Sequence, residues 1–248
     1  MQPHRIGFLA TGSELVSGEV INTNTPKMAA MLQAHGAKLG EHLVCDDTPA
    51  HLAQSLQFLS AHHQGILITG GLGPTSDDCT REVIAQHVGQ DLIFSHAAWN
   101  AIVKRLQPRY LNIPETNRRQ AYFPEKALLL ENPNGTAWGF YLTTESHDFF
   151  VLPGPPHEAL PLFETQVLSH LEALGYFSDH RILTWRVTGV SEALIAEQLD
   201  ALGEPFGLTF GYRAHAPFID IKLWISKTHP HLETIQTQVL AVIQDYRA

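Results

Sequence analysis

The residues from 65 to 80 constrain the fold of this 248-residue chain more than any other segment. The apolar run Gly65–Ile68 is typical of a buried strand, and three glycines follow it within four residues, at Gly70, Gly71 and Gly73. A strand that ends in such a loop and continues into a helix directs backbone N–H groups towards a shared point, where an anion can bind. The segment therefore predicts a phosphate-binding loop, in which the glycines, Thr75 and Ser76 supply the donors.

Two adjacent carboxylates, Asp77 and Asp78, follow the glycines. Phosphate and carboxylate repel each other, so this pair makes sense if a divalent cation lies between them. The alternative is a tight turn in which Asp78 caps the next helix. Asp46 and Asp47 leave the same choice open, because either could cap the helix that begins after them.

Alternating strands and helices predict the architecture of the first part of the chain. Strands are expected at 5–10, 39–44 and 65–68, and helices over 25–35, 48–62 and 79–87. Thr25 is the expected N-cap of the first helix, and Pro26 is its expected first helical residue. This alternation favours a parallel-rich sheet covered on both faces, which is a three-layer α/β domain. Ligands bind beyond the carboxyl ends of such strands. The loop at Gly12, the pair Asp46-Asp47 and the glycine loop all follow strands, so we expect them to meet in one active site.

The pattern changes near Gly175. Before it, the sequence predicts helices over 95–106, 115–122 and 157–174, and strands at 128–130, 138–143 and 149–152. After it, a strand (182–187), a helix (191–202), two strands (208–214 and 218–225) and a helix (231–246) are expected. We therefore predict an α/β domain over residues 1–172 and a small βαββα domain of the α+β class over residues 176–248.

Composition excludes several classes of protein. With 44% hydrophobic and 17% charged residues, the chain suits a soluble globular protein, and no apolar run approaches the roughly 20 residues of a membrane span. Its net charge of −9 argues against nucleic-acid binding, which depends on clustered Lys and Arg. Cys45 and Cys79 are too few for a disulfide framework, and no signal peptide is evident, so we expect a cytoplasmic protein.

Several other polar residues are candidates for substrate contact. The Asn-Gly turn at 134–136 offers donors, although an ordinary turn is the alternative, and Gly154 could equally belong only to a rigid turn before a helix. Asn117 and Gln120 lie three apart on a predicted helix and could contact a base or a ribose. The full predicted set of substrate contacts is Gly12, Ser13, Glu14, Gly70, Gly71, Gly73, Thr75, Ser76, Asn117, Gln120, Asn134, Gly135, Thr136 and Gly154.

The string from Thr69 to Asp78, with Thr80, resembles the signature of the CinA family of competence/damage-inducible proteins. Other segments agree in the family's order, namely 11–19, 22–24, 44–47, 117–121, 132–137 and 152–158, with weaker matches at 186–189 and 211–213. The resemblance spans essentially the whole chain. It implies an N-terminal domain of the molybdopterin-binding (MoCF-type) fold and a small KH-like C-terminal domain. That domain lacks a G-x-x-G loop, which favours packing or homodimer formation over RNA binding.

The resemblance also implies an activity. The family is similar to metal- and potassium-dependent ADP-ribose pyrophosphatases, and a related domain is linked to FAD hydrolysis. Asp46 and Asp78 are then expected to be the catalytic and metal-binding carboxylates, with Asp77 as second choice and Glu14 completing the metal site. The cation would be Co²⁺, Mn²⁺ or Mg²⁺, with K⁺ as a further cofactor, and the substrate a nucleotide diphosphate cleaved to AMP and ribose 5-phosphate.

One departure and one alternative qualify these expectations. Ser13 stands where many relatives have Asp, which removes one possible metal ligand. Many relatives also carry a C-terminal nicotinamide-nucleotide amidase domain, and because the sequence stops at Ala248 we expect no amidase activity. The alternative to an enzyme is a non-catalytic module that binds molybdopterin or a nucleotide, because the same fold and anion loops do not require turnover.

Overall fold

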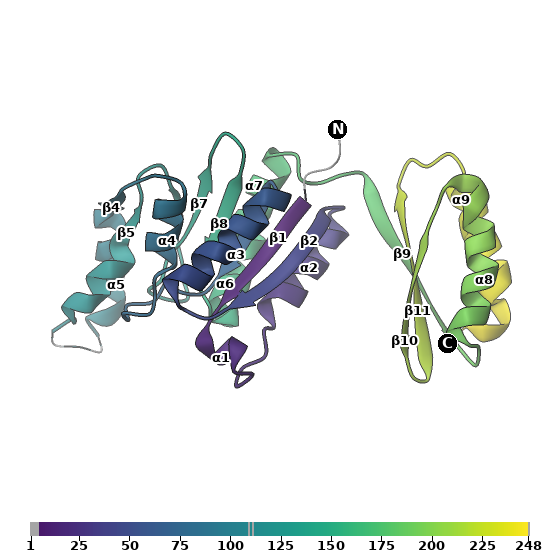
Figure 1. Ribbon diagram of the computed structural model, residues 1–248, viewed down its shortest axis with the longest axis horizontal. Coiled ribbons are helices and arrows are strands. Elements are labelled where there is room, and N and C mark those ends of the chain that lie inside the picture. The colour runs from purple at the N-terminus through teal and green to yellow at the C-terminus, as the bar shows by residue number, and fades with distance from the viewer. Residues whose placement is uncertain (1–4, 109, 111, 248) are drawn as a thin grey trace. The chain divides into compact units, whose positions relative to one another are not determined.

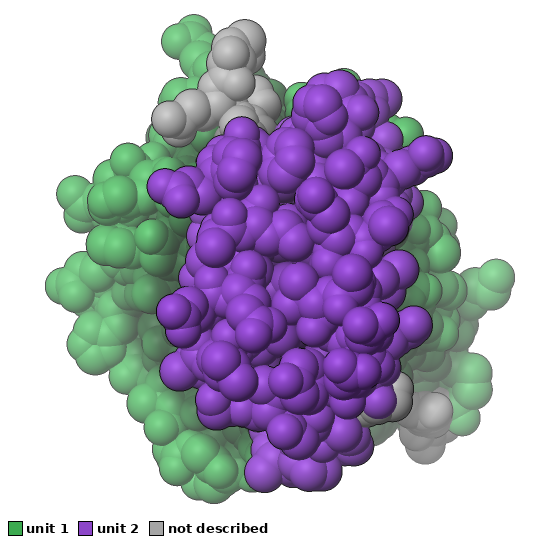
Figure 2. All heavy atoms as spheres, turned by 90° about the vertical axis from the view of Figure 1, so that its right-hand side faces the viewer, with its two compact units in different colours: residues 1–32, 38–176 green, residues 33–37, 177–248 purple. Residues whose placement is uncertain are grey.

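The computed structural model describes residues 5–108, 110 and 112–247, and it divides into two compact units (Figures 1 and 2). The first unit comprises the residues up to Leu32 and Lys38–Tyr176. The second comprises Gln33–Ala37 and the residues from Phe177 onwards. The break thus falls close to the boundary predicted near Gly175, but a short segment before the second strand also belongs to the second unit.

The first unit is built on one six-stranded sheet. Its strand order is β2 (Lys38–Cys45), β1 (Arg5–Thr11), β3 (Gly65–Thr69), β8 (Asp148–Leu152), β7 (Gly139–Thr143) and β6 (Leu128–Leu130). The first four strands are parallel, with Ile6 beside Gly65 and Gly65 beside Asp148, and β7 pairs antiparallel with both β8 and β6. Every residue of β3 is buried, as expected for a central parallel strand covered on both faces.

Helices cover both faces of this sheet (Figure 1). The helices of this unit are α1 (Ser13–Val16), α2 (Asn24–Ala34), α3 (Pro49–His62), α4 (Thr80–His87), α5 (His96–Leu106), α6 (Pro156–Leu162) and α7 (Leu168–Ala173). Of these, α1 has no buried residue and lies beyond the carboxyl end of β1 (Figure 1). Leu52, Leu56 and Leu59 of α3 and Ile84 of α4 pack against Ile68 in one fully buried cluster. This packing fixes the carboxyl ends of the parallel strands relative to one another.

Local structure departs from the sequence predictions at several places. The expected helix over 157–174 contains a π-helical turn, Phe163–Val167, between α6 and α7, and Pro161 lies just before it without an N–H to donate. Residues Glu115–Ala121 form a 3₁₀ helix. The antiparallel pair β4 (Leu92–Phe94) and β5 (Tyr122–Pro124) was not predicted, because its strands are only three residues long and far apart in sequence.

The start of α2 also differs from the prediction. The helix begins at Asn24, so Thr25 is not its N-cap and Pro26 is not its first residue. The Asn22 side-chain oxygen accepts a hydrogen bond (3.2 Å) from the Thr25 N–H. Asn22 therefore supplies the cap that was assigned to Thr25. The short helix α1, which follows Gly12, was not predicted either.

The second unit has its own three-stranded antiparallel sheet in the order β10-β11-β9. The elements are β9 (His180–Thr188), α8 (Glu192–Gly203), β10 (Phe210–His215), β11 (Phe218–Ser226) and α9 (Leu232–Ile243), in the predicted βαββα order. Figure 1 shows α8 and α9 on one face of this sheet, where Ile221, Leu223 and Val239 are fully buried. Within the described part of the chain, no helix has the length and apolar character that crossing a membrane requires.

Candidate functional site

A cavity of about 360 Å³ lies at the carboxyl ends of the parallel strands of the first unit. The loops after β1, β2, β3 and β8 all contribute to it, which agrees with the predicted convergence at one sheet edge. Its volume is typical of a small-molecule site. The cavity is lined by Thr11, Gly12, Glu14, Asp47, Gly70, Gly71, Leu72, Gly73, Pro74, Asp77, Asp78, Gln120, Thr136, Ala137, Pro153, Gly154, Pro155 and Glu158.

The glycine loop depends on glycine at two positions. Gly70 has φ 106° and Gly71 has φ 65°, conformations that other residues adopt only with strain. A Cβ atom on Gly70 would collide with the Thr11 carbonyl, and one on Gly71 would collide with the Thr80 hydroxyl. That hydroxyl donates to the Gly70 carbonyl (3.0 Å), so the loop is fixed to the start of α4.

Asp78 holds the glycine loop closed. Its Oδ1 accepts from the Gly73 N–H (2.7 Å), and its Oδ2 accepts from the Thr75 N–H (2.9 Å) and hydroxyl (2.6 Å). The helix-capping alternative for Asp78 is wrong, because α4 begins at Thr80 without a side-chain cap. The expectation that Gly73 and Thr75 donate to phosphate is also corrected, since Asp78 already accepts these hydrogen bonds.

Asp46 and Asp47 lie in different surroundings, and neither caps α3, whose N-cap is Thr48 without a side-chain hydrogen bond. Asp46 accepts from the Thr48 N–H (3.0 Å) and lies 2.9 Å from His51 Nδ1, and the Thr48 N–H, with His51, lowers its pKa. Asp46 does not line the cavity, so its assignment to the site is corrected. Asp47 lines the cavity instead, and accepts from Thr11 Oγ1 (2.8 Å) and from the Ser13 N–H (2.8 Å) and hydroxyl (3.1 Å).

The other predicted residues fall into two groups. Those that line the cavity are Gly12, Glu14, Gly70, Gly71, Gly73, Asp77, Asp78, Gln120, Thr136 and Gly154. Those that do not are Ser13, Asp46, Thr75, Ser76, Asn117, Asn134 and Gly135. Asn117 Nδ2 donates to Gln120 (3.3 Å), and Gln120 in turn donates to Thr136 (3.2 Å). The Gly70 N–H donates to the Leu152 carbonyl (3.0 Å), so it is not a phosphate donor either.

The turn at 134–136 is ordered by side chains outside the predicted set of substrate contacts. The Asn132 side-chain oxygen accepts from the N–H groups of Asn134 (2.9 Å) and Gly135 (3.1 Å), and its Nδ2 donates to Glu158 (2.6 Å). Arg105 donates to the Asn134 carbonyl. Glu158, which lines the cavity, comes from α6, and its position relative to this turn depends on tertiary packing.

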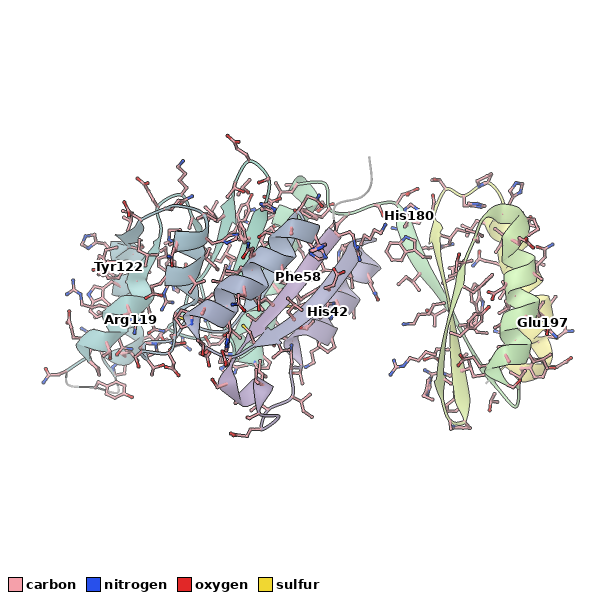
Figure 3. All side chains as sticks on the ribbon, in the orientation of Figure 1. His42, Phe58, Arg119, Tyr122, His180 and Glu197 are labelled. Carbon is pink, nitrogen blue, oxygen red and sulfur yellow. The ribbon has the colours of Figure 1, made fainter. Side chains whose placement is uncertain are left out.

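Arg81 is a second residue that the sequence did not reveal. Its guanidinium is fully buried behind the glycine loop and donates to the carbonyls of Leu72 (2.8 Å) and Gly73 (2.9 Å). Burial lowers its pKa to about 10. Arg119 (Figure 3) reaches the same loop from the 3₁₀ helix, donating to the Thr75 carbonyl (2.8 Å) and pairing with Glu82 (3.1 Å). Both cations bind carbonyls of the loop, and neither side chain lines the cavity.

The charge of the cavity is its most informative property. The lining includes five carboxylates, from Glu14, Asp47, Asp77, Asp78 and Glu158, and among the described residues that line it there is no Lys, Arg or His. Across the part of the chain that the structure describes, no three His, Cys, Asp or Glu side chains form a ready metal cluster. The predicted metal set of Glu14, Asp46 and Asp78 is therefore not assembled as a preformed site.

The first unit is thus an α/β domain with a mixed, doubly covered sheet, and a cavity lined by a glycine loop and carboxylates lies at its strand ends. The model of the family described as "Probable molybdopterin binding domain" matches residues 7–173, and the chain belongs to this family. This membership confirms the predicted fold class.

Comparison with individual proteins agrees with the resemblance to CinA. The chain is 36% identical over 197 residues to a Clostridium botulinum protein named as competence-damage inducible, covering 79% of this chain and 48% of that one. It is 32% identical over 225 residues to a CinA-like protein of Shewanella amazonensis, covering 89% and 52%. The crystal structure of CinA from Thermoplasma acidophilum, of unknown function, superposes with a TM-score of 0.63 at 26% identity, covering 68% and 99%. The chain spans about half the length of the curated relatives it matches.

Proposed function

We propose that this chain hydrolyses a nucleotide diphosphate with the help of a divalent cation, and that its substrate is ADP-ribose, which water cleaves to AMP and ribose 5-phosphate. The observation that carries this proposal is the composition of the cavity lining, in which a glycine loop stands with five carboxylates and the described lining residues include no Lys, Arg or His. A diphosphate placed there meets strong repulsion unless a cation balances the charge.

The donor chemistry of the lining fits such a cation. Carboxylate oxygens are preferred ligands of Mg²⁺ and Mn²⁺, and at nucleotide sites Mg²⁺ commonly takes only one or two carboxylates and completes its shell with phosphate oxygens and water. A site of this kind needs no preformed cluster of three side chains. Glu14 and Asp77 would hold the cation, because both line the cavity and have exposed side chains. A bound cation would neutralise phosphate oxygens and lower the pKa of a coordinated water.

The remaining groups of the site position the substrate. Gly71 is the glycine of the loop whose N–H is not engaged by the described hydrogen bonds of the loop, so it is the backbone donor we assign to phosphate. Gln120 and Thr136, which also line the cavity and are hydrogen-bonded to each other, offer further polar contacts. Asp77, whose pKa is lowered chiefly by the neighbouring Thr75 side chain, stays ionised at neutral pH and is suited to orient the attacking water.

A non-catalytic binding module is the second candidate, supported by the molybdopterin-binding family to which the chain belongs. In this alternative, Asp47 and Asp78 serve only to hold loops, as their hydrogen bonds indicate. FAD is the second candidate diphosphate substrate, and comparison of turnover with ADP-ribose and with FAD distinguishes the two.

The test is to incubate the protein with ADP-ribose, FAD or NAD, each with Co²⁺, Mn²⁺ or Mg²⁺ and with or without K⁺, and to follow AMP release. We expect metal-dependent AMP formation from ADP-ribose, and a loss on the order of 10²–10⁴ in rate for Asp77→Asn. Asp46→Asn is the matched control, because this neighbouring carboxylate lies outside the lining and should leave the rate unchanged. Absence of AMP with every metal and diphosphate would support the binding module instead.

A further inference from the structure

The sheet of the second unit has one face that neither of its helices covers (Figure 1). Side chains alternate between the two faces of a strand, and Ile221, Leu223 and Ile225 of β11 are buried in the cluster formed with α8 and α9. The intervening residues of β11 and their partners on β9 and β10 therefore project from the other face, which we call the open face. Among its residues are Arg186 of β9, Gly211 and Arg213 of β10, and Phe218, Lys222 and Trp224 of β11.

The charges of the second unit are segregated between these two faces. The helix α8 carries three carboxylates and α9 carries one, and neither contains Lys or Arg. The open face instead receives one cation from each strand, namely Arg186, Arg213 and Lys222. Its carboxylate Asp220 is already paired with Arg186 (2.7 Å), whereas Arg213 and Lys222 are exposed and pair with no carboxylate in the part of the chain that the structure describes.

This clustering bears on the expectation drawn from net charge. The chain as a whole carries a charge of −9, from which we predicted that it does not bind nucleic acid. The three cations are far apart in the sequence, and only the pairing of β9, β10 and β11 brings them to one surface. The open face therefore has an excess of positive charge that complements an anionic partner.

Aromatic rings accompany these cations. Trp224 is 36% exposed and stacks on His180, with ring centroids 5.9 Å apart and 13° between the ring planes. Phe218 lies beneath the guanidinium of Arg186, at 5.4 Å from the ring centroid. The rings of Trp224 and Phe218 belong to the same strand, about 20 Å apart at the usual rise of a strand, and Lys222 lies between them. Rings and cations therefore alternate along the open face.

From this alternation we infer that the open face binds single-stranded nucleic acid. Bases stack on Trp224 and Phe218, and phosphates contact Lys222 and Arg213, which is the combination that single-strand platforms use. A Cβ atom on Gly211 would meet only the Lys222 carbonyl, at 4.0 Å, so a base can lie against the backbone there. A duplex keeps its bases stacked on one another, and an acidic protein surface would use the cations without the rings. The inference does not depend on the proposed activity, which belongs to the first unit.

Fluorescence anisotropy with the full chain in metal-free buffer tests this inference. The probes are a labelled oligothymidylate and a labelled oligouridylate of about 12 nucleotides, and the competitors are duplex DNA of the same length and polyglutamate. We expect both single strands to bind more tightly than either competitor, and the stronger of the two identifies DNA or RNA. If Arg213 and Lys222 each neutralise one phosphate, the logarithm of the affinity should fall with the logarithm of the salt concentration with a slope of about −1.4.

Variants locate the surface. Trp224→Leu should weaken binding about tenfold without changing the salt slope, because it removes a stacking ring and no charge, and Trp224→Phe should weaken it less. Lys222→Gln should make the slope shallower by about 0.7, whereas Lys227→Gln, the same change in the turn after β11, should leave it unchanged. Leu240→Ala, at an aliphatic residue of α9 that is 37% exposed, is the control for lost apolar surface and should leave the affinity unchanged.

Three results would overturn the inference. The first is that neither oligonucleotide binds. The second is that polyglutamate competes as well as a single strand, which would favour an acidic protein partner. The third is that binding is insensitive to both Trp224→Leu and Lys222→Gln, which would place the nucleic acid on another surface. Selective binding of single strands without ADP-ribose cleavage would instead refute only the proposed activity.

Discussion

Replacing Asp78 with Asn tests whether this carboxylate acts on the ligand or on the loop. Its oxygens accept three hydrogen bonds of 2.6–2.9 Å, from the Gly73 N–H and from the N–H and hydroxyl of Thr75. An Asn side chain keeps one acceptor but turns an NH₂ group towards the two Thr75 donors. Hydrogen bonds to charged groups contribute about 1.5–3 kcal/mol each, and the Thr75 bonds are exposed, so we expect a loss of about 1–3 kcal/mol in the stability of the loop.

Amide hydrogen exchange is the appropriate assay, because it reports the opening of this loop separately from global unfolding. A loss of 1–3 kcal/mol corresponds to exchange about 5- to 150-fold faster at Gly73 and Thr75. Asp46→Asn is the control, because the Asp46 side chain contacts Thr48 and His51 and makes none of these hydrogen bonds, so it should leave exchange at Gly73 and Thr75 unchanged. Unchanged exchange in Asp78→Asn would refute the loop-closing role, and equally fast exchange in Asp46→Asn would show that the effect is not specific to Asp78.

Three further predictions concern other parts of the molecule. Arg81→Met should lower the free energy of unfolding by about 2–4 kcal/mol in urea denaturation, because the carbonyls of Leu72 and Gly73 lose their buried donors. Arg81→Lys should lower it less, and a larger loss in Arg81→Lys than in Arg81→Met would contradict this role. Gly135→Ala should speed amide exchange at Asn134, because its Cβ would collide with Glu158. Gly211→Ala, whose Cβ would meet only the Lys222 carbonyl at 4.0 Å and whose φ is not positive, should leave that site unchanged. Arg186 lowers the pKa of Asp220 to about 2. The second unit should therefore lose the stabilisation from the Arg186–Asp220 pair as the pH falls from about 4 through 2. Acid unfolding followed by hydrogen exchange should show less pH dependence in Asp220→Asn than in the wild type.

Sequence alone was sufficient for the features that local patterns encode. The alternation of strands and helices predicted the parallel part of the sheet and the edge at which the loops meet, because successive βα units place their loops at the same strand ends. The glycines at 70 and 71 signalled a tight loop, and both do adopt positive φ. The βαββα order after Gly175 followed in the same way from periodicity and turn residues.

Tertiary structure decided which side chains the loops present. Asp46 and Asp47 are adjacent and alike in sequence, yet the turn after β2 directs one to Thr48 and His51 and the other to Thr11, Ser13 and the cavity. Glu158 enters the lining only because α6 packs beside the turn at 134–136, and Arg81 is buried only because α4 folds back under its own loop. Periodicity constrains the backbone of each element, but the direction of a loop side chain depends on contacts with residues distant in the sequence.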